Sequence, residues 1–202
     1  MNTKSIASVI LLIVVITGIV FFARTPSTPV VVQPNHLANL YENIEEGFTI
    51  EYPEGFILNE DYEYRNLSEG KTIKGVQFKI STSVATGTNL SYDSYVSVEH
   101  LATSTSCTAA DFLDYRTGTT TMTDMGVTYS IASSSDAAAG NRYEEIVYVF
   151  PQSTPCLAVR YFIHYGAYQN YPEGSIREFD KQALLATFDT IRRSLVLKNK
   201  NR

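Results

Sequence analysis

The chain has 202 residues and a formal net charge of −5, and its charges are unevenly distributed. Residues 37–191 contain all 21 acidic residues and nine basic ones, a net charge of −12, whereas the flanking segments contain no Asp or Glu. Such an acidic body repels phosphate backbones, which excludes nucleic acid as the expected partner. With 44% hydrophobic residues, the chain can bury a core of moderate size, which argues against disorder.

The first feature along the chain is an uncharged run at residues 6–23, between Lys4 and Arg24. As a helix this run would extend about 27 Å, which matches the hydrocarbon core of a bilayer. Phe21 and Phe22 stand near its end, where a signal-peptidase site requires small residues. The run is therefore interpreted as an uncleaved transmembrane signal anchor, and a cleaved signal peptide is the alternative.

This anchor divides the chain into five segments. Lys4, with no acid nearby, favours a cytoplasmic location for residues 1–5. Residues 24–36 contain three prolines and no helical period, which is typical of a semi-rigid tether. Residues 37–197 are then expected to form a domain outside the cytoplasm, and residues 198–202 a basic tail.

Short alternating runs predict β-strands through much of this domain, because side chains alternate between the two faces of a strand. Strands are expected at residues 47–52, 76–84 and 127–131, with two less clear segments at 56–64 and 89–101. Turns or loops are expected at residues 53–55, 117–126 and 133–141.

Three segments predict helices. Residues 37–44 are compatible with a short one, and residues 108–115 begin with Thr108 and Asp111, which resemble an N-cap pair. Residues 180–195 carry an apolar stripe with spacings of four, three and four, which predicts a helix lying across a sheet. The strands do not alternate regularly with helices, so the expected class is α+β, an antiparallel sheet with helices packed on it.

The clearest pair of strands is a β-hairpin at residues 142–150 and 156–165, joined by a loop with two prolines. If Phe150 lies opposite Cys156, one face is apolar and the other face is mixed. On the mixed face Arg142, Glu144, Arg160 and His164 would converge. This set is either a structural lattice of ion pairs or, alternatively, the site of a hydrolase acting on envelope polymer. A shift of register by one residue would separate its members.

Cys107 and Cys156 are the two cysteines of the chain. Because the anchor places them in an oxidising compartment, where an even number of cysteines is usually paired, a disulfide between them is expected. Two buried free thiols and intermolecular pairing are the alternatives. The bond would join the segment that begins at Thr108 to the second strand of the hairpin.

No cofactor or metal site is expected, because the three histidines have no Cys or His at ligand spacing. Tyr165, Tyr168 and Tyr171 recur three apart in a loop. If exposed, their rings can stack on a sugar or a peptide; the alternative is that one or two of them pack on the sheet.

Phe48–Phe56, with the sequence FTIEYPEGF, resembles the opening strand and turn of PsbP-like domains, and residues 184–195 are similar to their closing helix. The resemblance implies an antiparallel sheet with helices on its faces and an accessory role without catalysis. Residues 89–191 also resemble uncharacterised membrane-anchored proteins of small-genome bacteria.

Together these patterns predict a single-pass membrane protein of the bacterial cell envelope. Its N-terminal helix would hold it in the membrane and display a non-catalytic binding or accessory domain outside the cytoplasm. The expected ligand is an envelope protein or glycan, and the sequence does not indicate an oligomeric state.

Overall fold

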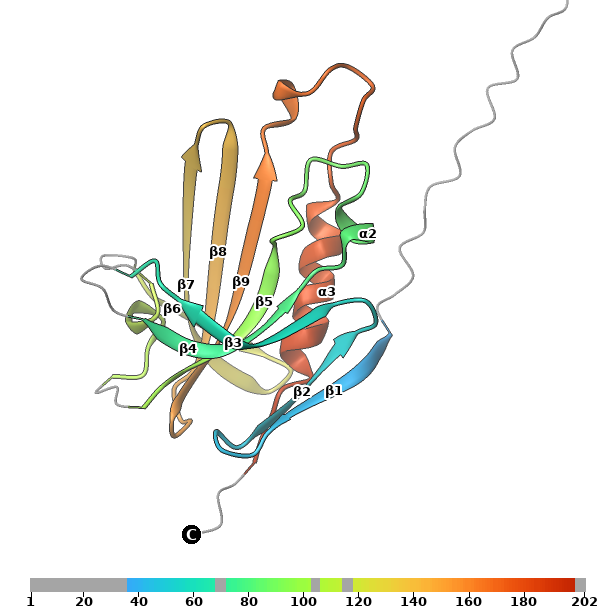
Figure 1. Cartoon of the computed structure of the whole chain (residues 1–202). Coiled ribbons are helices and arrows are strands. Elements are labelled where there is room, and N and C mark those ends of the chain that lie inside the picture. The colour runs from blue at the N-terminus through green and yellow to red at the C-terminus, as the bar shows by residue number, and fades with distance from the viewer. Residues whose placement is uncertain (1–35, 68–71, 103–105, 114–117, 199–202) are drawn as a thin grey trace, which may run out of the picture. The chain divides into compact units, whose positions relative to one another are not determined.

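A seven-stranded antiparallel sheet forms the larger part of the fold, and its centre is the predicted hairpin (Figure 1). The order of its strands is β3-β4-β5-β9-β8-β7-β6. The computed structural model describes residues 36–67, 72–102, 106–113 and 118–198. The strands of this sheet are β3 (Ile57–Tyr64), β4 (Ile73–Lys79), β5 (Tyr95–Leu101), β6 (Thr120–Asp124), β7 (Val127–Ala138), β8 (Asn141–Phe150) and β9 (Cys156–Gly166).

A smaller antiparallel sheet has the order β1-β2-β10. It contains β1 (Leu37–Asn43), β2 (Phe48–Pro53) and β10 (Val196–Leu197). The last of these strands directly follows α3 (Lys181–Arg193), and the described residues also include α2 (Thr82–Ala85) and two 3-10 turns, Ala109–Asp111 and Tyr168–Asn170. Asp180 begins α3 as an N-cap, because its carboxylate accepts a hydrogen bond of 2.9 Å from the backbone N–H of Ala183.

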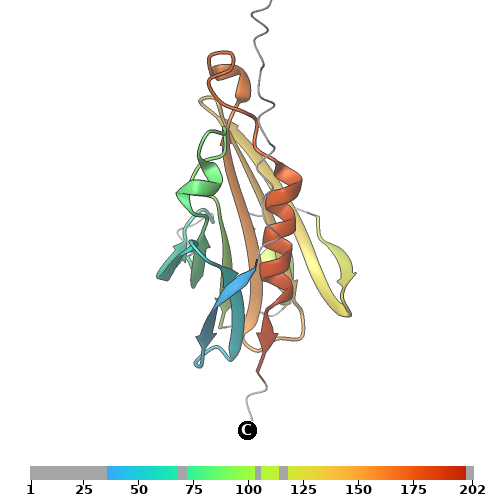
Figure 2. The ribbon, with the colours of Figure 1, turned by 90° about the vertical axis from the view of Figure 1, so that its right-hand side faces the viewer.

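The two faces of the large sheet differ in what covers them. On the face that we call the helix face, α3 packs against the strands (Figure 2), and Leu184, Phe188 and Ile191 pack into the main core. The opposite face, which we call the disulfide face, has a second core that includes Cys107, Phe112 and several tyrosines. The buried helix-face residues of β8 and β9 are Tyr148, Phe150, Leu157, Val159, Tyr161 and Ile163.

The predicted α+β class was wrong, because antiparallel strands dominate the described residues and α3 is their only helix of more than four residues. Residues 37–44, expected to be helical, form β1, in which partly buried and exposed residues alternate and the backbone pairs with β2. Residues 117–126 were expected to be a loop, yet 120–124 form β6. Their threonines are β-branched and suit a strand.

Three further boundaries differ from the prediction. The strand expected at 76–84 ends at Lys79, and Val84 lies in α2. Residues 133–141 are mostly strand, since β7 continues to Ala138. The N-cap pair of Thr108 and Asp111 is confirmed as a capping box, but it opens only a 3-10 turn. The strands expected at 47–52 and 127–131 are confirmed, and the unclear segments at 56–64 and 89–101 supply β3 and β5.

The predicted transmembrane segment, residues 6–23, lies outside the described residues, as do residues 1–5, most of the tether and most of the tail. None of the helices in the part of the chain that the structure describes is long and apolar enough to span a membrane.

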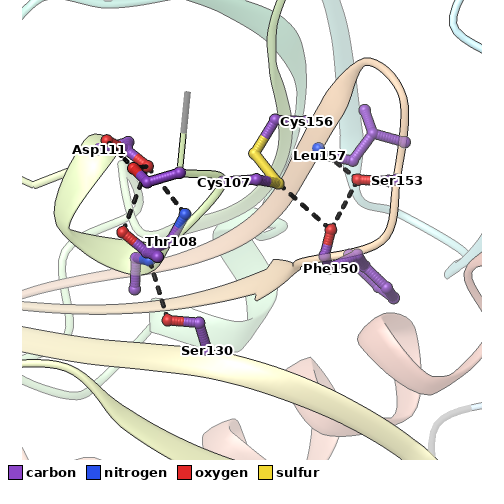
Figure 3. The surroundings of a disulfide bond; sticks show 10 residues. Cys107, Thr108, Asp111, Ser130, Phe150, Ser153, Cys156 and Leu157 are labelled. Carbon is purple, nitrogen blue, oxygen red and sulfur yellow. Dashed lines mark hydrogen bonds between the residues drawn. A yellow bond between two sulfur atoms is a disulfide. The ribbon is translucent and has the colours of Figure 1, made fainter. Parts of the chain in front are cut away.

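The predicted disulfide between Cys107 and Cys156 is confirmed, with a Cα–Cα distance of 5.5 Å (Figure 3). The bond fixes the segment that contains the 3-10 turn Ala109–Asp111 to the start of β9. A second link to the sheet is the backbone N–H of Ala109, which donates to the hydroxyl oxygen of Ser130 at 3.1 Å. This segment therefore covers one end of the disulfide face.

Replacing both Cys107 and Cys156 with alanine is expected to lower the free energy of unfolding by about 4 kcal/mol, because the bond closes a loop over a sequence separation of 49 residues. Urea unfolding measures the change. The unmodified protein in reductant serves as the control and should unfold at the same urea concentration as the double variant. Equal stability of the oxidised protein and the variant would contradict the expectation.

Candidate functional site

The register of the central hairpin differs from the predicted one by one residue. Phe150 lies opposite Leu157, not Cys156. Because side chains alternate, this shift moves every side chain of β8 to the other face relative to β9. Both faces are apolar near the loop, so alternation in the sequence does not distinguish the two registers. The predicted convergence of Arg142, Glu144, Arg160 and His164 was therefore wrong, since the structure divides the set between the two faces.

Arg142 and Glu144 lie on the helix face. The Glu144 carboxylate accepts a hydrogen bond of 2.8 Å from the Tyr165 hydroxyl and forms an ion pair of 2.5 Å with Lys181 at the start of α3. Partial burial, followed by the Glu144 carboxylate, raises the pKa of Tyr165. Arg142 is exposed, and its guanidinium donates to the backbone oxygen of Asn141 at 3.2 Å. Glu144 therefore connects β8 to the helix.

Arg160 lies on the disulfide face and is fully buried. Its Nε and Nη2 donate to the two oxygens of Glu99 at 2.7 and 2.9 Å, and Nη2 also donates to the backbone oxygen of Phe112 at 2.6 Å. A second carboxylate, Glu145, contacts Nη1. The Tyr64 ring lies 3.5 Å from the guanidinium carbon, a cation–π distance. The guanidinium is thus paired along its donor edges, which offsets part of the cost of burying its charge.

Tyrosine hydroxyls complete this network. Tyr62 donates to Glu99 at 3.0 Å, and Tyr64 donates to Glu145 at 3.0 Å. Burial, followed by the charge of Glu99, raises the pKa of Tyr62 far above its usual value. Burial alone would lower the pKa of Arg160, but the charge of Glu99 and its hydrogen bonds raise it. The network therefore holds its charges fixed as a structural lattice.

His164 lies at the other end of the disulfide face. Its Nδ1 is 2.8 Å from an Asp93 carboxylate oxygen, and its Nε2 is 3.1 Å from Asn141 Oδ1. The ring stacks on Tyr143 with a centroid distance of 4.5 Å. The nearby Ser94 hydroxyl bonds with the His164 backbone instead of the ring. An Asp–His pair is present, but its second nitrogen faces an amide and not a nucleophile, so this arrangement orients the ring.

Between these two groups the disulfide face has a cleft of about 400 Å³, which we call the aromatic cleft. This volume lies in the range of small-ligand sites. The rings of Tyr143 and Phe162 are half-buried, with centroids 6.3 Å apart, and Phe162 stacks on Tyr95 at 4.9 Å. Carboxylates and apolar side chains both reach the cleft. Its lining consists of Tyr64, Asn66, Leu113, Ser134, Asp136, Tyr143, Glu145 and Phe162.

The three loop tyrosines do not form one platform. Tyr165 packs on the Phe179 ring with a centroid distance of 5.1 Å. Tyr168 and Tyr171 are more exposed, and the Tyr168 hydroxyl donates to the backbone oxygen of Ile176 at 3.2 Å. For Tyr165 the structure therefore supports the alternative in which the ring packs on the protein.

A groove of about 570 Å³ lies between the smaller sheet and the strands β3 to β5. Its lining is strongly acidic, and His100 forms a contact of 3.3 Å with Glu46 there. No group of three or more His, Cys, Asp or Glu side chains within the described residues is arranged to hold a metal ion. The charged residues of the lining are Glu45, Glu46, Glu60, Asp61, Glu63, Lys74 and His100.

The sequence-based prediction missed both carboxylates that pair with Arg160. A usable signal existed for Glu99, which is the one acidic residue of the mostly apolar segment Tyr95–Leu101 and must therefore have a partner if the strand is buried. Glu145 gave no comparable signal, because its position depends on the hairpin register. The aromatic cleft depends on the same register.

No protein-family model matches the chain, and no curated protein matches it. A solved structure from Bacteroides thetaiotaomicron is similar with a TM-score of 0.45 and 8% sequence identity. The similarity covers 83% of this chain and 51% of the Bacteroides chain, so the present chain spans about half the length of that protein. The resemblance to PsbP-like domains stays a prediction.

Replacing Glu99 with glutamine is expected to lower the free energy of unfolding by about 3 kcal/mol, because the change removes one charge from a buried ion pair. The matched control is Glu63→Gln, since Glu63 pairs at 2.9 Å with Arg65, whose side chain is 73% exposed. The control should change stability by no more than about 0.5 kcal/mol. Urea unfolding of both variants measures the difference. Equal losses of stability would show that the buried pair contributes no more than the exposed one.

Proposed function

We propose that this chain is a membrane-anchored, non-catalytic binding module of the bacterial cell envelope, and that the aromatic cleft is its ligand site. The observation that carries the proposal is the pair of half-buried rings, Tyr143 and Phe162, beside the Glu145 carboxylate. Rings that retain an accessible face offer apolar contact area, and they lose little conformational freedom on binding.

The charged groups around the cleft support binding over catalysis. Arg160 is fully buried and holds both Glu99 and Glu145, so none of these three groups is poised for proton transfer. His164 uses both ring nitrogens in contacts with Asp93 and Asn141. Phe162 stacks on Tyr95 and Tyr143 stacks on His164, and rings that are held in this way lose less entropy when a ligand binds.

Two features support a location outside the cytoplasm. The uncharged run at residues 6–23 has the length of a transmembrane anchor, and residues 24–36 have the composition of a tether. The disulfide between Cys107 and Cys156 is of the kind that forms and persists in oxidising compartments. The acidic body would then face the exterior of the cell.

Protease added to spheroplasts that express the full chain is expected to degrade residues 37–197, because the proposal places them outside the membrane. Immunoblotting with an antibody against the domain measures the loss. A cytoplasmic protein of the same cells is the control and should remain intact. Protection of the domain together with that control would overturn the proposed topology.

The variant Tyr143→Ala is expected to weaken binding of the detergent-solubilised chain to isolated cell envelopes at least about fivefold, because loss of one aromatic contact costs roughly 1 kcal/mol or more. Co-sedimentation at several envelope concentrations measures the affinity. The matched control is Tyr92→Ala, since Tyr92 is 61% exposed and does not line the cleft.

Envelopes treated with protease or with a muramidase show whether the ligand is a protein or a glycan. If Tyr143→Ala and Tyr92→Ala both bind envelopes with unchanged affinity, the aromatic cleft is not the ligand site. Weakening by both variants to the same extent would have the same consequence, because it would show a general effect of losing a tyrosine.

A further inference from the structure

One edge of the large sheet is only half covered. β6 pairs with β7 over Val127–Ile131, whereas β7 continues to Ala138 and pairs with β8 along its whole remaining length. Among the described residues, no strand pairs with Ser133–Ala137 on the side away from β8. Figure 1 shows this upper half of β7 at the margin of the sheet, without a neighbouring strand on its outer side.

The hairpin turns determine which backbone groups point outward. Ala139 and Gly140 form a two-residue turn with φ values of 48° and 81°, so Ala138 and Asn141 exchange hydrogen bonds across it. Hydrogen-bonded pairs recur at every second residue of an antiparallel ladder. The backbone groups of Ser134 and Asp136 therefore point to β8, and those of Ser133, Ser135 and Ala137 point away from it.

The opposite turn gives the same result. Met125 and Gly126 form the two-residue turn between β6 and β7, with φ values of 50° and 83°, and Asp124 pairs with Val127. Val127 and every second residue after it therefore point to β6, and the same row continues through Ser133 and Ser135 beyond the end of β6. The Ala137 N–H, the last of the row, donates to the Asp136 carboxylate at 2.7 Å.

A cleft adjoins this edge on each face. The aromatic cleft reaches the edge at Ser134 and Asp136 on the disulfide face. A second cleft, of about 460 Å³, extends from the edge onto the helix face and is lined by Ser135, Asp136, Ala137 and residues of β8 and β9. Successive side chains of a strand paired to β7 would enter these two clefts alternately. The residues that β8 and β9 contribute to the second cleft are Arg142, Tyr143, Glu144 and Tyr165.

We propose that the outer edge of β7 binds an extended peptide by strand addition, which rests on the proposed function and identifies its ligand. Ser133 and Ser135 supply main-chain hydrogen bonds, and an aromatic or large apolar side chain of the peptide occupies the aromatic cleft. The site ends at Asp136, because the Ala137 N–H already donates a hydrogen bond to the Asp136 carboxylate.

Charge distinguishes a peptide of another protein from a second copy of this chain. The folded body, residues 37–198, contains 21 acidic and twelve basic residues, a net charge of −9, and Asp136 stands on the edge itself. Two such bodies repel each other, whereas a peptide with lysine or arginine near the aromatic side chain complements the Asp136 carboxylate. The expected partner is therefore a basic, extended segment.

The test begins with a library of random heptapeptides displayed on phage and selected against the full-length chain in detergent. The expected result is enrichment of sequences with an aromatic residue flanked by basic ones. One enriched peptide is then added, and hydrogen exchange is measured at single amides. The Ser133 and Ser135 amides are expected to exchange at least tenfold more slowly, while Ser134 and Asp136, already bonded to β8, change little.

Ser135→Pro provides an independent test, because it removes an outward N–H and leaves the hydrogen bonds to β8 in place, as proline does on edge strands. The variant is expected to bind the peptide at least tenfold more weakly. The matched control is Ser135→Val, which keeps the N–H and should retain the affinity. If the proline variant fails to fold, the exchange pattern of the unmodified chain decides the question.

The outcomes separate this proposal from the proposed function. A peptide that depends on Tyr143 but protects neither Ser133 nor Ser135 overturns strand addition and leaves the aromatic cleft as the ligand site. Absence of any enriched peptide also overturns strand addition. It leaves the proposed function standing, because that function is tested by binding to envelopes. Protection of the same two amides without peptide, increasing with protein concentration, identifies a second copy as the occupant and overturns the proposal.

Discussion

The buried ion pair between Arg160 and Glu99 is the interaction on which the arrangement of the large sheet depends. Arg160 lies opposite Ser97 in the pairing of β9 with β5, so Glu99 is its diagonal neighbour on the same face. A shift of one residue would move Glu99 to the helix face, into an apolar core without a partner for its charge. The cost of burying an unpaired carboxylate therefore fixes this register more strongly than the apolar side chains do.

The same pair explains why the two faces of the sheet have different roles. The helix face is filled by aliphatic and aromatic side chains and is covered by α3. The disulfide face must supply hydrogen bonds to two carboxylates, and tyrosines, Ser97 and Arg160 supply them, while the backbone oxygen of Phe112 accepts from Arg160. Because the disulfide-bonded segment covers only one end of this face, the rings of Tyr143 and Phe162 remain half-buried beyond it.

The parts of the fold that follow from local sequence were predicted, and the parts that depend on distant partners were not. The hairpin and the helix that begins after Asp180 have local signatures, and both are present. The disulfide is the exception, since it joins distant residues and was predicted from the even number of cysteines. The hairpin register was wrong because Phe150 lies between apolar residues that suit either face. β1 was missed because its backbone pairs with β2 and its side chains pack on the main core. A short window of sequence does not show these partners.

A second buried arginine connects the helix face to the edge of the sheet. Arg192 of α3 donates to the Tyr161 hydroxyl at 2.9 Å and forms an ion pair of 2.5 Å with Asp124 at the end of β6. Hydrogen bonds from Arg193 and then Arg192 lower the pKa of Asp124. These contacts fix the turn at which β7 begins, while the two-residue turn at Gly140 fixes its other end against β8. The open half of β7 is therefore held at both ends, and an incoming strand would meet an edge that is already in the conformation required for pairing.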